Sequence, residues 1–147
     1  MIEYREERGN IFEKYMNKPV SFAHCISGDF ALGAGIAEQF NNRFHIRESL
    51  KTMYPYGMNH PCCIYTDRVF NLVTKQRCYF KPNYYSLNKA LEDMADKYVK
   101  IRKFLPSDTV VMPKIGCGLD KLEWYAVKPI IQEVFKEIEI RIIICNK

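Results

Sequence analysis

Residues 20–37 read VSFAHCISGDFALGAGIA, and this stretch decides the fold. Its first part, residues 20–26, is short, largely apolar and bounded by turn residues, which predicts a buried strand. Residues 34–44 have apolar side chains on one side and predict a helix. Three glycines lie at the junction between the two elements. Because glycine allows sharp bends and a close approach of the backbone to a ligand, this junction is a candidate binding site.

The alternation of strands and helices continues along the chain. Further strands are expected at residues 68–75, 109–112 and 140–145, and further helices at residues 87–101, with Ser86 as N-cap, and at residues 124–138. Pro129 is tolerated only in the first turn of a helix, so the last helix either begins near Val127 or kinks at Pro129. This order predicts an α/β fold in which a largely parallel sheet carries helices on both faces.

A second glycine cluster follows the strand at residues 109–112, in the sequence PKIGCGLD of residues 113–120. Ligands of parallel sheets lie beyond the carboxyl ends of the strands, and both clusters lie there. Backbone N–H groups in such loops can bind a phosphate. The spacing fits neither a Walker loop nor a dinucleotide fingerprint. The alternative is that the glycines serve only the turns and that Asp120 caps the next helix.

Lys75 ends the strand at residues 68–75. A lysine in this position is either an ordinary solvated charge or, in a desolvated cleft, a nucleophile toward an electrophilic carbon. The isolated residue does not decide between these alternatives.

The composition limits the classes of protein to which the chain can belong. The 147 residues are 48% apolar and 27% charged, which predicts one domain over residues 1–147. No apolar run approaches the roughly 20 residues of a membrane span, and the charged N-terminus does not resemble a signal peptide, so a cytoplasmic protein without a membrane partner is expected. The six cysteines form no C-x-x-C pair and do not space with histidines as metal ligands do, so reduced thiols and no metal are expected.

The formal charge of +5 suits either nucleic acid or a small polyanionic ligand, but the basic residues are scattered. Four aromatic residues, Tyr79, Phe80, Tyr84 and Tyr85, lie among lysines and could stack on bases. The alternative is that these rings pack at the start of the following helix.

Taken together, these motifs carry a family resemblance. Residues 23–27 and 33–37, then Thr74 and Lys75, then residues 113–120 followed by Trp124, resemble a macrodomain. The chain is similar, more narrowly, to the terminal ADP-ribose protein glycohydrolase branch, which includes antitoxin macrodomains acting on ADP-ribosylated DNA. The resemblance implies a three-layer α/β/α fold with a mixed, largely parallel sheet and a cleft for ADP-ribose.

The resemblance also implies the site residues. Lys75 matches the catalytic lysine of that branch, and Asp120 matches its catalytic aspartate. Ligand contacts are implied for Asn10, Ile11, Ser27, Gly33, Ala34, Gly35, Ile36, Ala37, Thr74, Pro113, Ile115, Gly116, Cys117, Gly118 and Leu119. The chain departs from the family at Asn10, where an aspartate that contacts adenine is expected. An asparagine can still donate or accept a hydrogen bond at the edge of adenine.

The implied activity is removal of ADP-ribose from a modified target, with Lys75 as nucleophile and Asp120 as acid and base. The target is a glutamate or aspartate ester, a DNA base or O-acyl-ADP-ribose. No cofactor is expected; the expected partners are ADP-ribose and ADP-ribosylated protein or DNA, and the expected state is a monomer. The alternative is a reader module that binds ADP-ribose without hydrolysing it.

Overall fold

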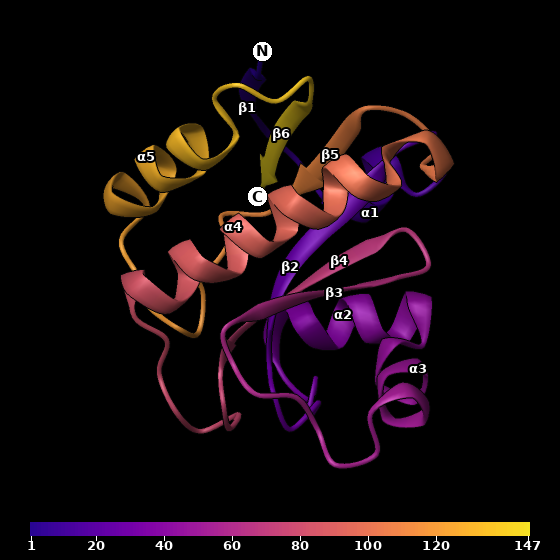
Figure 1. Ribbon diagram of the computed structural model, residues 1–147, viewed down its shortest axis with the longest axis vertical. Coiled ribbons are helices and arrows are strands. Elements are labelled where there is room, and N and C mark those ends of the chain that lie inside the picture. Colours follow the sequence, from indigo (N-terminus) through magenta and orange to yellow (C-terminus); the bar gives the residue numbers. More distant parts are fainter.

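Six strands form one sheet in the computed structural model, which describes residues 1–147 (Figure 1). The strands are β1 (Glu3–Arg8), β2 (Ser21–Ser27), β3 (Cys62–Thr66), β4 (Val69–Lys75), β5 (Thr109–Met112) and β6 (Arg141–Asn146). Across the sheet their order is β1-β6-β5-β2-β4-β3. Every neighbouring pair is parallel except β3 and β4, which form an antiparallel hairpin. The predicted mixed, largely parallel sheet is therefore confirmed.

Helices cover both faces of this sheet. They are α1 (Ile11–Tyr15), α2 (Gly35–Phe44), α3 (Ile46–Met53), α4 (Tyr84–Ile101) and α5 (Trp124–Phe135), with a 3-10 turn at Arg102–Phe104. One buried core joins α4 and α5 to the sheet, and a second core joins α1, α2 and α3 to it. The fold is thus a three-layer α/β/α arrangement. None of the helices combines the length and apolarity that crossing a bilayer requires.

The central strands supply both cores by alternation. Val110 and Met112 of β5 belong to the core under α4 and α5, whereas Val111 between them belongs to the core under α1, α2 and α3. In β6, Ile142 and Ile143 divide between the two cores in the same way. Successive side chains of a strand point to opposite faces, so a strand covered on both faces is apolar at every position. This is why these strands were predicted correctly from continuous apolar runs.

Two predictions about helix ends are wrong. The N-cap of α4 is Asn83 and not Ser86, which lies in the first turn and completes a reciprocal capping box with Asn83. The last helix begins at Trp124, as predicted, and not at the alternative start near Val127; it runs through Pro129 but ends at Phe135 and not at residue 138. Pro129 has no N–H, so it cannot bond to the carbonyl of Tyr125 one turn earlier. Burial of Val127, Ile131 and Phe135 offsets the missing bond.

Candidate active site

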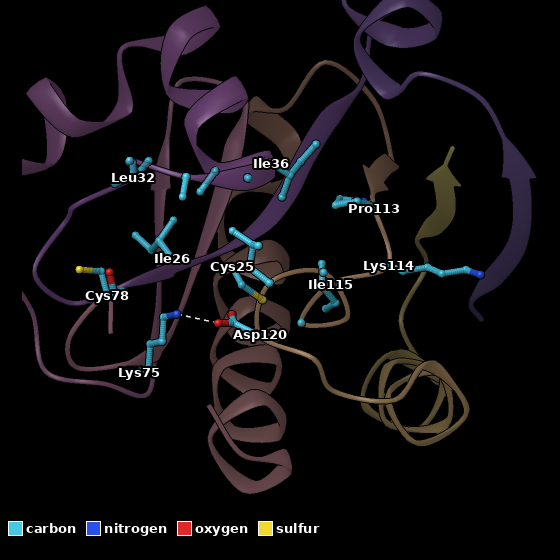
Figure 2. Close-up of a pocket in the computed structure, with 18 of the residues that line it drawn as sticks. Cys25, Ile26, Leu32, Ile36, Lys75, Cys78, Pro113, Lys114, Ile115 and Asp120 are labelled. Carbon is cyan, nitrogen blue, oxygen red and sulfur yellow. Dashed lines mark hydrogen bonds and ion pairs between the residues drawn. The ribbon is translucent and has the colours of Figure 1, made fainter. Parts of the chain in front are cut away.

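The main cavity opens at the carboxyl ends of β2, β4 and β5 and has a volume of about 460 Å³ (Figure 2). Two loops form about half of its wall. We call residues 28–34, between β2 and α2, the first loop, and residues 113–123, between β5 and α5, the second loop. These loops contain the two predicted glycine clusters, which therefore lie at one edge of the sheet as expected from the strand order.

Lys75 and Asp120 face one another in this cavity. Lys75 is the last residue of β4, and its Nζ lies 2.6 Å from Oδ1 of Asp120 in the second loop (Figure 2). Their side chains are 13% and 15% exposed, so Lys75 is not an ordinary solvated charge. Asp120 does not cap the next helix either, because the N-cap of α5 is Glu123. The fold thus brings together an amine and a carboxylate that are 45 residues apart in the sequence.

The start of α2 points unpaired backbone N–H groups at the same cavity. Ala34 is the N-cap and offers no side-chain acceptor, and the first bond of the helix is from the N–H of Glu38 to the carbonyl of Ala34. The N–H groups of Gly35, Ile36 and Ala37 therefore have no partner within the helix. These three residues line the cavity. The arrangement suits the negatively charged oxygens of a diphosphate.

The two loops meet over the cavity. Gly35 has a φ of +60°, and a Cβ added there would lie 2.9 Å from Cδ1 of Leu119, so the Leu119 side chain rests on this glycine. Lys81, from the segment between β4 and α4, donates to the carbonyl of Leu119 at 3.0 Å. The backbone next to Asp120 is thus held from two sides.

Most predicted ligand residues line the main cavity. They are Ser27, Gly33, Ala34, Gly35, Ile36, Ala37, Pro113, Ile115, Gly116, Gly118 and Leu119, together with Lys75 and Asp120. Thr74 and Cys117 are not among its lining residues, and Thr74 is buried within β4. Sequence reasoning missed Cys25, Ile26, Leu32, Cys78, Lys81, Lys114 and Asn146. Cys25 and Ile26 directly precede Ser27 in β2, so strand continuity was a usable signal for these two residues.

Asn10 and Ile11 line a second cavity of about 170 Å³. This cavity shares Ile36, Pro113 and Asn146 with the main one, so the two cavities adjoin, and we call them together the cleft. Figure 2 shows that Ile36 and Pro113 lie at the side of the main cavity opposite the Lys75–Asp120 pair. The cleft therefore has a charged end with the paired amine and a second end near Asn10.

The buried thiol of Cys25 does not compete with Lys75 as a nucleophile. Burial, together with the negative charge of Asp120, raises the pKa of Cys25 to about 12. At neutral pH Cys25 is therefore a neutral thiol, whereas the reactive form of cysteine is the thiolate.

All six cysteines are free. The chain also brings together no group of three or more His, Cys, Asp or Glu side chains that could hold a metal ion.

The four aromatic residues near the start of α4 are exposed. Tyr79 is 75% exposed, Phe80 47%, Tyr84 38% and Tyr85 64%, so the expectation that they pack at the start of the helix is wrong. Tyr84 accepts a hydrogen bond from the N–H of Glu123, which ties this segment to the second loop. These rings are therefore an accessible surface connected to the loop that carries Asp120.

No family model matches the chain. A sequence relative is the ADP-ribose glycohydrolase OARD1 of Bos taurus, which is 39% identical over 123 residues, covering 83% of this chain and 78% of the relative. Among solved structures, the macrodomain of Thermus aquaticus DarG superimposes with a TM-score of 0.82 at 21% identity, covering 100% of this chain and 99% of that chain.

A third similar protein is Thermosipho africanus DarTG, solved in complex with ADP-ribose. It superimposes with a TM-score of 0.74 at 14% identity, covering 99% of this chain and 42% of that chain. At such identities the structural likeness concerns the fold, which agrees with the three layers and the sheet described above.

Proposed function

The chain belongs to the macrodomain family, with the ADP-ribose glycohydrolase OARD1 as a relative, and we propose that it hydrolyses ADP-ribosylated targets through Lys75 and Asp120. It binds ADP-ribose and is a hydrolase. The observation that supports the assignment of the two residues is their contact of 2.6 Å inside the cleft. An amine beside a carboxylate supplies a nucleophile and a proton-transfer group at one place.

The first step forms a covalent bond to Lys75. The amine of Lys75, free after transfer of its proton to Asp120, attacks the anomeric carbon of the distal ribose. The bond from that carbon to the target breaks, and the leaving oxygen or nitrogen takes the bonding electrons. Protonated Asp120 gives its proton to a nitrogen leaving group, or to solvent water where the leaving group is a carboxylate, and is ionised again in either case. The product is a protonated glycosylamine adduct on Lys75 and a target free of ADP-ribose.

The second step releases ADP-ribose. Asp120, now ionised, removes a proton from a water molecule, which attacks the same carbon or the imine of the opened sugar. The bond to the Lys75 nitrogen breaks, and that nitrogen recovers a proton from Asp120. The unpaired N–H groups at the start of α2 hold the diphosphate throughout, so the reacting carbon stays beside the amine.

The target is a glutamate or aspartate ester, a DNA base or an acyl ester of ADP-ribose itself. The exposed rings Tyr79, Phe80 and Tyr85 keep a nucleic-acid carrier among these candidates, because exposed aromatic side chains can stack on unpaired bases. Offering an ADP-ribosyl glutamate peptide, ADP-ribosylated DNA and O-acetyl-ADP-ribose side by side, and comparing product yields, distinguishes the three classes.

Three variants test the catalytic assignment. Lys75→Ala removes the amine, and we expect turnover to fall at least about 10³-fold. Lys75→Arg keeps a cation beside Asp120 but cannot act as a free amine, so it should be equally inactive. Asp120→Asn should still form the adduct slowly and release it more slowly. Borohydride reduction should trap an adduct in the parent protein and none in either Lys75 variant.

The results also separate the enzyme from a reader module. Calorimetry should show that Lys75→Arg still binds free ADP-ribose, because the diphosphate contacts remain. Turnover by Lys75→Arg at the parent rate would contradict the nucleophilic role and leave Lys75 a purely electrostatic one. An absence of turnover in the parent protein with all three substrates would favour the reader.

A further inference from the structure

The end of the cleft away from Lys75 determines which nucleobase fits. This inference rests on the proposed function, in which the distal ribose lies at Lys75 and the diphosphate lies at the start of α2. The base then extends past Ile36 and Pro113 into the second cavity, because these residues line both parts of the cleft. Ile11, Phe12 and Pro113 give this part of the cleft apolar surface against which a flat heterocycle can pack.

Asn10 presents only a donor to this cavity. Its Oδ1 accepts two hydrogen bonds, from the N–H of Phe12 at 2.9 Å and from the N–H of Glu13 at 3.2 Å. These bonds fix the orientation of the amide, because the opposite orientation would set its NH₂ group against two backbone N–H groups. Nδ2 of Asn10 makes no hydrogen bond within the protein. Asn10 can therefore donate to a bound base and has little capacity left to accept from one.

The other polar side chains of the cavity do not compensate. Oδ1 of Asn146 accepts from the N–H of Lys114 at 3.2 Å, so this amide too has its oxygen turned to the backbone. No aspartate or glutamate lines the cavity. Gln39 is exposed on the surface of α2, where its side chain can exchange partners with water. The oxygens of both fixed side-chain amides, Asn10 and Asn146, are thus held by backbone N–H groups, and Nδ2 of Asn146 itself donates to the carbonyl of Lys147 at 3.5 Å.

We propose that this end of the cleft recognises a purine by donating from Nδ2 of Asn10 to an acceptor atom of the base, and that it does not select for the 6-amino group of adenine. An amino group is a donor and needs an acceptor opposite to it. With the oxygen of Asn10 occupied by α1, the amino group gains no fixed side-chain acceptor here. Asn10 is in this sense a specificity-determining residue of the chain.

The test compares two ligands by calorimetry: free ADP-ribose and its analogue in which unsubstituted purine replaces adenine. Both keep the ring nitrogens that accept hydrogen bonds, and only ADP-ribose has the 6-amino group. The parent protein should bind the two ligands with dissociation constants within threefold of each other. A parent protein that binds ADP-ribose more than threefold tighter than the analogue would overturn the inference.

Two variants provide matched controls. Asn10→Asp keeps the N-cap of α1, since aspartate caps helices as well as asparagine, but turns an acceptor toward the base. It should shift the ratio of the two dissociation constants at least threefold in favour of ADP-ribose. Asn10→Ser also keeps the cap but removes the outward group, and it should weaken both ligands by a similar factor. A ratio unchanged by Asn10→Asp would show that residue 10 does not face the base.

The outcome also separates this inference from the proposed function. Binding of both ligands with the wrong ratio overturns the inference alone. Failure of the parent protein to bind either ligand overturns the assignment of the cleft to ADP-ribose, and the inference with it. Thermal unfolding of Asn10→Asp and Asn10→Ser, expected to match the parent protein, confirms that the cap has been kept.

Discussion

The first and second loops both contain glycine clusters, but they are held in place differently. The first loop is held through its backbone. The N–H of Gly28 donates to the carbonyl of Lys75 at 2.8 Å, and the carbonyl of Gly28 accepts from the N–H of Met58 at 2.9 Å. Phe30 and Leu32 adopt positive φ angles of 56° and 42°, and both side chains are buried. Such backbone is strained and persists only where the surroundings fix it.

The second loop is anchored by side chains from other segments rather than by backbone-to-backbone bonds. Its contacts with distant residues are those of Asp120 with Lys75, of the Leu119 carbonyl with Lys81, of the Lys114 N–H with Asn146 and of the Glu123 N–H with Tyr84. A Cβ added at Gly118 would meet nothing within 4 Å. The difference teaches that one wall of the cleft is fixed through its backbone and the other mainly through side chains. In the proposed function, the diphosphate docks on the first wall, and the carboxylate that transfers protons is on the second.

The largest effect should come from adding one carbon at Gly28 of the first loop. In Gly28→Ala the new Cβ would lie 2.1 Å from the carbonyl oxygen of Met58, which is backbone and cannot move aside cheaply. We expect the free energy of unfolding to fall by about 3 kcal/mol. Gly118→Ala, with open space around the new carbon, should change it by less than about 0.5 kcal/mol. Urea denaturation of both variants measures the contrast.

Equal losses in the two glycine variants would contradict the comparison, because they would mean that both loops are fixed to the same degree. Equal and small losses would mean that the first loop can shift away from Met58. Substrate turnover by Gly118→Ala should stay within a few-fold of the parent protein, since the folded structure is preserved.

A smaller effect is expected at Asp29, whose carboxylate holds the first loop together. It accepts from the Ser27 hydroxyl at 2.6 Å and from the N–H groups of Ala31 at 3.2 Å and Cys78 at 2.9 Å. Asp29→Asn places an NH₂ group opposite one of these donors. We expect a loss of about 2 kcal/mol in the free energy of unfolding, measured by urea denaturation. A loss below about 0.5 kcal/mol would show that the loop is held without this carboxylate.

The same contacts give the first loop a dependence on pH. Burial acts to raise the pKa of Asp29, but the hydrogen bonds from Ser27, Cys78 and Ala31 outweigh it and hold the pKa below its usual range. The folded protein therefore binds fewer protons at Asp29 than the unfolded chain does. The resulting stability is complete above about pH 4 and is lost as the pH falls through the lower, folded-state pKa. The Asp29→Asn variant should lack this part of the acid sensitivity.

The sequence predicted where the two loops lie, but not which contacts hold them in place. Glycine clusters after buried strands located both loops, and the family resemblance identified Lys75 and Asp120 as a pair. The first loop is held by residues that are distant in the sequence. Met58 and Cys78 contact it from segments in which no sequence pattern indicated such a contact. Long-range hydrogen bonds of this kind depend on the assembled sheet, so a local pattern does not contain them.

Weak or short local patterns explain the elements that the sequence did not predict. β1 is an edge strand that pairs only with β6. Its residues are almost all charged, so the alternation of apolar and polar residues that indicates a half-buried strand is absent. α1 has only five residues, too few to show a helical period. α3 follows α2 directly after His45, which has a left-handed backbone conformation and separates the two helices. The buried strands β4 and β5, in contrast, were predicted to within one residue.

The smallest effect on stability, and the one that bears most on function, is expected at Lys81. Its ammonium group donates to the carbonyl of Leu119 at 3.0 Å, directly before Asp120, and the lysine is exposed. Lys81→Met keeps the length of the side chain and removes this bond. The free energy of unfolding should change by less than about 0.5 kcal/mol, since exposed polar contacts contribute little. Because the bond positions the loop that carries Asp120, kcat should fall roughly three- to tenfold with a smaller change in KM.

Gly118→Ala serves as the control within the same loop, since it leaves this bond in place. An unchanged kcat in Lys81→Met would mean that Lys75 alone positions Asp120, and the second loop would then be as fixed at its tip as the first.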